Sequence, residues 1–347
     1  MTGTVDAMRI GMLTGGGDCP GLNGVIRAVV TTCARNGHET VGLIHGWRGL
    51  LERTTRPLSP TDVAGILGEG GTILRSSRTN PFSRDDGPAE CTAAFADLGL
   101  DALVAIGGED TLGVARRLHD ELGLPTIGVP KTIDNDLSGT DYTFGFWTAV
   151  QIAVDAIDRL RTTAASHDRV MVVEVMGRHS GWIALESGIA GSADAILLPE
   201  VPVDVDEIVA GIGRLREAGR DYAIIVVSEG VEIGGDEEGE VDEFGHKQLA
   251  KASVGEALAD MLKARTGADT RATVLGHVQR GGTPIAYDRV LSTRYGVRAA
   301  ELVEARAFGR MVALRGDEIV DIPLSDAVSE LKLVPPELYA TAAGFFA

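Results

Sequence analysis

The sequence has few cysteines, few aromatic residues and no excess of positive charge. Its 347 residues include 3 cysteines and 5% aromatics. Cys19, Cys33 and Cys91 form no C-x-x-C pair or Cys/His metal spacing, which favours single thiols in a reducing compartment. The 32 basic and 50 acidic residues give a formal net charge of −18. This charge argues against nucleic acid or an anionic membrane surface as a partner, since both require a basic face.

Long hydrophobic runs are also missing. No apolar stretch approaches the ~20 residues that span a bilayer, and the first residues lack the pattern of a signal peptide. We therefore expect a soluble, cytoplasmic protein. Two nucleotide-binding fingerprints are missing as well: there is no G-x-x-x-x-G-K-[ST] segment, and Pro20 stands where G-x-G-x-x-G needs its third glycine.

Glycine, by contrast, is abundant, and it follows apolar runs. The 45 glycines are nearly twice the usual share of about 7%. Continuous apolar runs at 8–14, 100–108 and 124–130 alternate with segments of helical period, as in parallel sheets covered on both faces. A second such series begins near residue 146, and the length suits two domains. Residues 312–324 predict a late hairpin.

Six of the predicted strands end in glycine-rich, charged turns. In open α/β sheets, ligands bind outside the carboxyl ends of the strands. One such turn is weak evidence, but six with complementary chemistry predict a ligand site. The turns are TGGGDCPG (14–21), IGGEDT (106–111), VPKTIDND (129–136), VMGRHSG (175–181), VSEG (227–230) and LGHVQRGG (275–282). The acidic segment at 232–247 has no apolar period and predicts a solvated loop.

The acidic residues of these turns suit phosphoryl transfer. Asp134 and Asp136 would point to one side if the backbone between them is extended. One could then take a proton from a hydroxyl while the other holds Mg²⁺ beside a phosphate. An Asp/Asn turn with capping side chains explains the same pair equally well. Glu229, at the end of an apolar strand, either accepts hydrogen bonds from sugar hydroxyls or caps the next turn.

Glycines and cations of the turns suit phosphate groups. Gly15–Gly17 can offer backbone N–H groups to a phosphate at the start of the following helix, or serve only the turn. Guanidinium forks match phosphate oxygens, and several arginines stand at strand starts or ends rather than along helices. These basic residues are Arg78, Arg169, Arg178, Arg271, His277 and Arg280.

The motifs together resemble the phosphofructokinase A family over residues 8–335. The matching segments include LTGGGDCPGLN, GGTILRSSR, PKTIDND, VEVMGRHSGW and RATVLGHVQRGGTPIAYDR. The resemblance implies two doubly wound, Rossmann-like α/β domains with the active site in the cleft between them. A phosphoryl-donor domain would comprise 1–145 plus about 279–325, and a fructose 6-phosphate domain 146–278 plus about 326–347.

The resemblance also implies residue roles. Asp134 would deprotonate the 1-hydroxyl of fructose 6-phosphate, with Thr132 beside the transferred phosphoryl group and Arg178 stabilising its charge. Glu109 and Asp136 would lie near Mg²⁺. The donor residues would be Gly17, Arg78, Asp110 and Lys131. The sugar phosphate residues would be Ile133, Arg169, Met176, Gly177, Glu229, Arg271, His277, Val278, Gln279 and Arg280.

Two turn residues bear on the phosphoryl donor. Members of this family that use ATP have glycine at the positions of Asp110 and Lys131, so both residues indicate pyrophosphate. A carboxylate at Asp110 would repel the α-phosphate of ATP by about 4 kcal/mol at ~4 Å and an effective dielectric of ~20. Lys131 would supply a cation to the shorter donor. The predicted reaction is reversible phosphorylation of fructose 6-phosphate at O1 to fructose 1,6-bisphosphate, a step of glycolysis and gluconeogenesis.

Two alternatives remain. One is an ATP-dependent 6-phosphofructokinase that tolerates Asp110, and the other is a non-catalytic regulator that binds a sugar phosphate. The family draws the equivalents of Arg169 and Arg271 from a neighbouring subunit, which implies a homodimer or homotetramer. Arg75 stands where the family pattern has glycine.

Regulation by nucleotides is not expected from the sequence. Arg27 and Asp194 fit the effector-binding pattern of bacterial ATP-dependent members of the family. Thr31 and Asp221, however, replace an arginine and a lysine of that pattern. Without these two cations, the protein would bind a phosphate-bearing effector more weakly.

Overall fold

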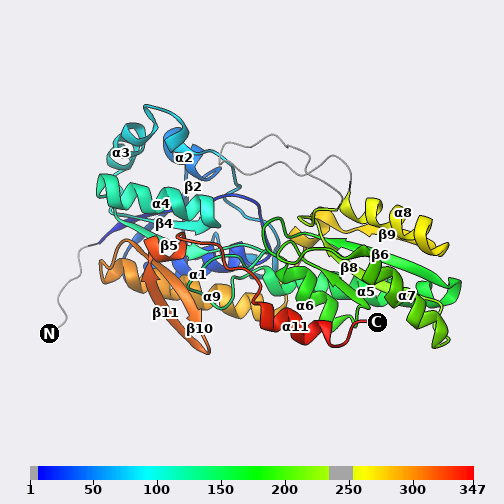
Figure 1. The fold of residues 1–347 in the computed structure, drawn as a ribbon. Helices are drawn as coiled ribbons and strands as arrows, with labels where there is room; N and C mark the ends of the chain where they lie inside the picture. The colour runs from blue at the N-terminus through cyan, green and yellow to red at the C-terminus, as the bar shows by residue number, and fades with distance from the viewer. Residues whose placement is uncertain (1–6, 234–252) are drawn as a thin grey trace. The chain divides into compact units, whose positions relative to one another are not determined.

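The computed structural model describes residues 7–233 and 253–347 (Figure 1). The loop predicted at 232–247 lies outside the described residues except for its first two. The chain divides into two compact units. Unit 1 holds the described residues of Met1–Ile133, Leu137–Trp147 and Arg280–Leu331, and unit 2 holds those of Asp134–Asp136, Thr148–Gln279 and Lys332–Ala347.

Unit 1 is built on a seven-stranded sheet in the order β11-β10-β5-β4-β1-β2-β3. The central strands β10, β5, β4, β1 and β2 are parallel, whereas β11 and β3 pair antiparallel at the two edges. The hairpin of β10 and β11 was predicted from the sequence and is confirmed. The strands are β1 (Arg9–Thr14), β2 (Glu39–Leu43), β3 (Thr55–Leu58), β4 (Ala102–Gly107), β5 (Thr126–Pro130), β10 (Arg310–Arg315) and β11 (Glu318–Pro323).

Helices cover both faces of this sheet. In Figure 1, α2, α3 and α4 lie on one face, and α1 with α9 lies on the other. The helices are α1 (Leu22–Arg35), α2 (Trp47–Leu51), α3 (Gly87–Asp97), α4 (Glu109–Leu122), α9 (Ala286–Glu304) and α10 (Leu324–Ala327), with 3-10 turns η1 (Ile66–Gly68) and η2 (Pro81–Ser83).

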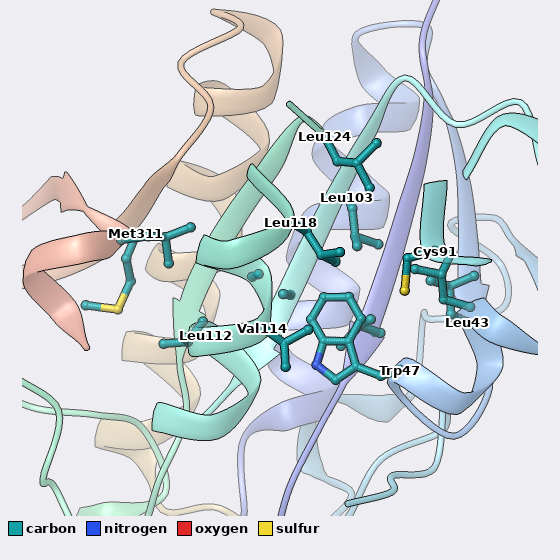
Figure 2. Close-up of a cluster of buried hydrophobic side chains, with 14 of the residues drawn as sticks. Leu43, Trp47, Cys91, Leu103, Leu112, Val114, Leu118, Leu124 and Met311 are labelled. Atoms are coloured by element: carbon teal, nitrogen blue, oxygen red, sulfur yellow. The ribbon is translucent and has the colours of Figure 1, made fainter. Parts of the chain in front are cut away.

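A buried hydrophobic cluster joins the sheet of unit 1 to α2, α3 and α4 (Figure 2). Leu103 of β4 packs there with Leu118 of α4 and Trp47 of α2, and none of the three is more than 2% exposed. Val104, the next residue of β4, is also 0% exposed and faces the opposite side, because side chains alternate along a strand. The sheet is therefore buried on both faces, as the continuous apolar runs predicted.

Unit 2 contains a four-stranded parallel sheet in the order β7-β8-β6-β9. Val172 of β6 and Ile225 of β8 pack against Ile212 of α7 and Leu258 of α8 in a second core. The elements are α5 (Phe146–His167, which begins in unit 1), β6 (Arg169–Val175), α6 (Trp182–Ala190), β7 (Ala195–Leu197), α7 (Val205–Glu217), β8 (Ala223–Ser228), α8 (Val254–Thr266), β9 (Asp269–Val274), η3 (Gly276–Arg280) and α11 (Pro336–Ala343).

Local signals explain where two helices of unit 2 begin. The Asp204 side chain accepts hydrogen bonds from the N–H groups of Asp206 and Glu207, and that of Ser253 accepts one from the N–H of Glu256. Both are N-caps that satisfy otherwise unpaired donors of the first helical turn.

The unit boundaries differ slightly from those expected from the sequence. They fall after Trp147, Gln279 and Leu331 rather than after residues 145, 278 and 325. A short segment expected in the first domain, Asp134–Asp136, belongs to unit 2. Two residues of unit 2 hydrogen-bond to the backbone of this segment: Ser180 Oγ donates to Asp134 O, and Lys332 N donates to Asp136 O.

The three cysteines are buried and free of disulfides. Burial raises the pKa of Cys19, Cys33 and Cys91 to about 12. Separately, none of the helices in the described part of the chain combines the length and the apolar character that crossing a membrane requires.

Candidate active site

In unit 1, three turns predicted to bind the phosphoryl donor lie at the carboxyl ends of the parallel strands. Gly15–Gly17 follows β1, Glu109 and Asp110 follow β4, and Lys131 follows β5. These strands are adjacent and parallel, so their carboxyl ends meet. Backbone hydrogen bonds continue past the strands, from Gly15 N to Ile106 O (3.0 Å) and from Lys131 N to Gly107 O (2.9 Å). The structure therefore brings these turns together.

The glycine loop after β1 is enclosed by side chains. A Cβ on Gly15 would lie 2.4 Å from Thr111 Oγ1, and one on Gly17 would lie 2.5 Å from Arg280 Nη1. Lys131 Nζ donates a hydrogen bond to Gly17 O. Glycine is thus required by close packing as well as by the turn. Two cations, Lys131 and Arg280, flank this loop, which suits a phosphate group.

Arg280 contacts a different part of the chain than the resemblance suggested. It was expected to hold the 6-phosphate of the sugar with His277. Its Nη1 donates to Asp18 O at 3.4 Å instead, and its guanidinium lies against Gly17. In this structure Arg280 therefore joins the donor loop, and its role in binding the sugar phosphate stays a prediction.

The segment that carries Arg78 is attached to the same loop. Gly16 N donates to Ser77 O at 3.2 Å, and Ser76 Oγ donates to Gly16 O. Arg78 follows and is exposed. Arg75 has a left-handed backbone with φ of 58°, which explains why the family pattern has glycine there. The sequence did not reveal this backbone strain.

Glu109 and Asp110 form the first turn of α4. The N-terminus of a helix carries partial positive charge, so acidic residues are stabilised there. A helix N-terminus is also where a phosphate commonly binds. The two carboxylates therefore stand at a helix N-terminus, directly after Gly107, the last residue of β4, and Gly108, the N-cap of α4.

The segment that contains the predicted base links the two units. The chain passes from unit 1 to unit 2 after Ile133 and returns after Asp136. On the unit 1 side, Thr143 Oγ1 donates to Thr132 O at 2.7 Å. Ile133, predicted to contact the substrate, is completely buried. The two residues before Asp134 are thus held in place, Thr132 by a hydrogen bond to its backbone oxygen and Ile133 by burial.

The backbone between the two carboxylates is not extended. Asn135 has φ of 53°, which is the left-handed region that Asn tolerates better than most residues. The alternation argument for Asp134 and Asp136 required an extended chain and is therefore wrong. The left-handed residue between the two aspartates breaks the simple period of two.

In unit 2, the predicted sugar phosphate residues follow three adjacent parallel strands. Met176–Arg178 follows β6, Glu229 follows β8, and His277–Gln279 lies in η3 after β9. Gln279 Oε1 accepts a hydrogen bond from Met176 N at 2.8 Å, and Glu229 N donates to Val175 O at 2.9 Å. These turns therefore meet at the carboxyl edge of the unit 2 sheet.

Close backbone packing holds the turn after β6. Gly177 has φ of 135°, and a Cβ there would lie 2.6 Å from both Ser180 O and Ser228 Oγ. A Cβ on Gly230 would lie 1.9 Å from Arg178 O. Only glycine fits at these two positions, so the loops that carry Arg178 and Glu229 are locked together.

Exposure differs among the residues of η3. Gln279 is completely buried, which matches its hydrogen bond to Met176. Val278 is 62% exposed, and His277 is exposed as well. Gln279 thus organises the turn, whereas His277 and Val278 face solvent in this chain.

Arg169 and Arg271 are the predicted site residues that unit 2 does not gather with the others. Arg169 is the first residue of β6, and Arg271 is near the start of β9. Since a strand of seven residues is roughly 20 Å long, Arg169 lies at the opposite end of the sheet from Met176. Asp269 pairs with both arginines, at 2.7 Å from Arg169 Nε and 3.0 Å from Arg271 Nη2. The hydrogen bond from Arg169, with the charge of Arg271, lowers the pKa of Asp269.

Sequence reasoning missed several residues that support the site. Ser180 and Glu200 hydrogen-bond to the site loops, as does the backbone N–H of Lys332. Ser180 could have been noticed because it lies two residues after Arg178. Glu200 and Lys332 have no local signal, since their partners are distant in sequence.

A family model described as "Phosphofructokinase" matches residues 9–303, and the chain belongs to the phosphofructokinase family. A "Pyrophosphate--fructose 6-phosphate 1-phosphotransferase" of Amycolatopsis methanolica is 59% identical over 345 residues, which are 98% of this chain and 100% of that protein. An "ATP-dependent 6-phosphofructokinase 3" of Streptomyces coelicolor is 52% identical over 340 residues, covering 96% of this chain and 99% of that protein.

Solved structures agree with the fold. A phosphofructokinase of Pichia pastoris in the T-state has a TM-score of 0.83 at 32% identity; the match covers 98% of this chain but 36% of the longer yeast chain. A pyrophosphate-dependent phosphofructokinase of Nitrosospira multiformis has a TM-score of 0.84 over 95% of this chain and 86% of its own. At 21% identity, the latter supports the two-domain α/β fold alone.

Proposed function

We propose that this protein transfers a phosphoryl group from pyrophosphate to O1 of fructose 6-phosphate, producing fructose 1,6-bisphosphate and orthophosphate. The observation that carries the proposal is the group of turns at the carboxyl ends of β1, β4 and β5. There Lys131 contacts Gly17, and Asp110 stands in the first turn of α4. Relatives named for this reaction are 50–59% identical over nearly the whole chain. A phosphoanhydride bond is broken and a phosphate ester bond is formed, and we propose that the reaction runs in both directions.

The chemistry assigns each residue a simple task. Asp134 accepts the proton of the sugar 1-hydroxyl as O1 attacks the nearer phosphorus. The bridging P–O bond of pyrophosphate breaks, and orthophosphate leaves. Arg178 and Lys131 balance charge on the transferring and leaving oxygens, with Thr132 beside the transferring group. Such transfer depends on positioning and electrostatics more than on covalent catalysis.

Donor choice follows from charge and length. Pyrophosphate needs two phosphate positions, which Gly15–Gly17, Lys131 and Arg78 provide in this proposal. ATP would place a further phosphate near the first turn of α4, where Asp110 adds negative charge. The same turn is stabilised by the helix dipole, so the acid does not destabilise the fold while it disfavours the longer donor.

Magnesium completes the proposed site. Among residues 7–233 and 253–347, no group of three or more His, Cys, Asp or Glu side chains could hold a metal by itself. Mg²⁺ in phosphoryl transfer is commonly held by one or two carboxylates together with substrate phosphates. Glu109 and Asp136 are the carboxylates proposed for this role. The ion would neutralise phosphate oxygens during transfer.

The sugar phosphate is proposed to bind in unit 2 and to need a second copy of the chain. Met176, Gly177, Glu229 and His277–Gln279 would hold the sugar. Arg169 is the first residue of β6 and Arg271 is the third residue of β9, so both precede the carboxyl ends of these strands and suit the site of a neighbouring copy. The strand of Arg271, β9, is at the sheet edge; exposed Val274 (45%) is on it and exposed Val278 (62%) follows it. A homodimer or homotetramer follows, and we place it in the cytoplasm.

Donor-specific turnover tests the proposal. Purified protein with Mg²⁺ and fructose 6-phosphate receives pyrophosphate in one assay and ATP in another, and fructose 1,6-bisphosphate is measured. Turnover with pyrophosphate alone is expected. Turnover with ATP alone would favour the second candidate, an ATP-dependent 6-phosphofructokinase, which the 52% identical relative of that name supports. No turnover with either donor would overturn both.

A further inference from the structure

A hydrogen bond in unit 2 connects the two segments that carry the proposed catalytic groups. Ser180 is completely buried, and its Oγ donates to the backbone oxygen of Asp134 at 3.1 Å. Ser180 is also two residues after Arg178 in the same turn. The backbone of the proposed base is therefore tied directly to the turn that carries the proposed charge-stabilising arginine.

Glu200 holds the other side of this turn. Its Oε1 and Oε2 accept hydrogen bonds from Gly181 N at 3.0 and 3.1 Å. Oε1 also accepts one from Val334 N at 3.1 Å. A Cβ on Gly181 would lie 3.0 Å from Glu200 Oε2, so glycine allows the carboxylate to approach. Bonds from N–H groups to a charged acceptor are stronger than neutral ones.

The segment reached by Glu200 also contacts the backbone of Asp136, the residue that carries the second carboxylate of the site. Lys332 N donates to Asp136 O at 2.9 Å. Trp182 Nε1 donates to Lys332 O at 2.8 Å, and Lys332 Nζ lies 4.9 Å from the centre of the Trp182 ring. Hydrogen bonds and short stretches of chain thus connect the two aspartates. The connection runs from Asp134 through Ser180 and Gly181 to Glu200, then through Val334 and Lys332 to Asp136.

We propose that Glu200 and Ser180 are positioning residues that hold the Asp134–Asp136 segment and the Arg178 turn in one arrangement. The inference rests on the proposed function. Neither side chain is assigned a contact with the reacting atoms; both act through the backbone of other residues. Asn135 has a left-handed backbone, so the segment needs external hydrogen bonds to keep this conformation. Small displacements of a reacting group reduce turnover strongly.

The test compares Ser180→Ala and Glu200→Gln with two matched controls. Ser187→Ala removes another completely buried serine hydroxyl, which donates to Ile183 O at 2.6 Å. Glu217→Gln removes an exposed carboxylate at the end of α7. We expect each test variant to lower kcat about tenfold with KM changed less than about twofold. Both controls should keep the kcat of the wild type.

A double variant adds a second readout. Since Ser180 and Glu200 act on one arrangement, their combined effect on kcat should be smaller than the product of the two single effects. Thermal unfolding of each variant shows how much of the loss is due to stability. If Glu200→Gln does not fold, Ser180→Ala with its buried-serine control still decides the question.

Each result has a defined meaning. A fall in kcat of the folded test variants, absent from the controls, supports the inference. Test variants with wild-type kcat, whether or not they melt earlier, would overturn it and leave the proposed function intact. A wild type without turnover on either donor would overturn the proposed function and this inference with it.

Discussion

At the scale of single residues, we propose that two positions determine the choice of phosphoryl donor. Asp110 places its charge at the N-terminus of α4, and Lys131 reaches Gly17 through its ammonium group. Both are in the turns where the family pattern for ATP has glycine. In the proposed function, the two positions would combine repulsion of a longer donor with attraction of a shorter one.

The double variant Asp110→Gly, Lys131→Gly is expected to gain use of ATP and to lose use of pyrophosphate. Removal of a repulsion of about 4 kcal/mol sets an upper limit of roughly a thousandfold on the gain. The measurement is kcat/KM for each donor. Asp120→Gly, an exposed acid on the same helix, is the control and should leave the donor ratio unchanged. A double variant without any gain on ATP would contradict this account.

At the residue scale, we also predict that the three cysteine thiols are unreactive in the native protein. Burial raises the pKa of Cys19, Cys33 and Cys91 to about 12, so they are protonated and unreactive at pH 7 to 8. The native protein should show almost no reaction with a thiol reagent such as 5,5′-dithiobis(2-nitrobenzoate), and the denatured protein should show three thiols. Rapid labelling of the native protein would disagree with the burial.

At the scale of elements, the paired starts of β6 and β9 are joined by charge. The register places Arg169 opposite Asp269, and Asp269 pairs with Arg169 and Arg271. The hydrogen bond from Arg169 is the largest influence that lowers the pKa of Asp269. This carboxylate therefore orders two arginines that we propose to act at the site of another copy.

A lowered pKa makes the contribution of Asp269 to stability dependent on pH. The contribution is present above the ordinary pKa of an aspartate and is lost as pH falls through the lowered value. Asp269→Asn should therefore unfold at lower urea concentration than the wild type at pH 7. The difference should shrink as pH approaches about 3. Glu217→Gln serves as the control, and a difference independent of pH would contradict the assignment.

Some strands could be predicted from the local hydrophobic pattern of the sequence. The apolar runs predicted β1, β4, β5, β6 and β8 because continuous hydrophobic strands belong to buried parallel sheets. The alternation argument for Asp134 and Asp136 failed because it assumed an extended backbone at Asn135. A backbone dihedral of this kind depends on distant hydrogen bonds, such as that from Ser180.

At the scale of the whole molecule, the site is proposed to need two copies of the chain. Arg169 begins β6, at the opposite strand end from Met176, and Arg271 is the third residue of β9, which Gln279 follows. A single copy therefore cannot bring all of these predicted sugar phosphate residues to one edge of the unit 2 sheet. A symmetric assembly can, because each copy would complete the site of its neighbour.

Mixing two inactive variants tests this arrangement. Asp134→Asn lacks the proposed base, and Arg271→Ala lacks a proposed phosphate contact from the neighbour. If subunits exchange at random after mild denaturation and refolding, half of the dimers are hybrids with one complete site. Activity should then reach about a quarter of the wild type. Each variant refolded alone is the control, and a mixture no more active than these controls would place both residues in one copy.

The class of fold, the glycine-rich turns that follow the strands and the residue types in them suited to phosphate and sugar could all be read from the amino-acid order alone. These features depend on local period and side-chain chemistry, which a sequence displays directly. Three others required the folded chain: Arg280 lies against Gly17, Asn135 is left-handed, and Glu200 holds the turn after Arg178. Strand order and contacts between distant segments set these features, because they arise from packing that no local pattern encodes.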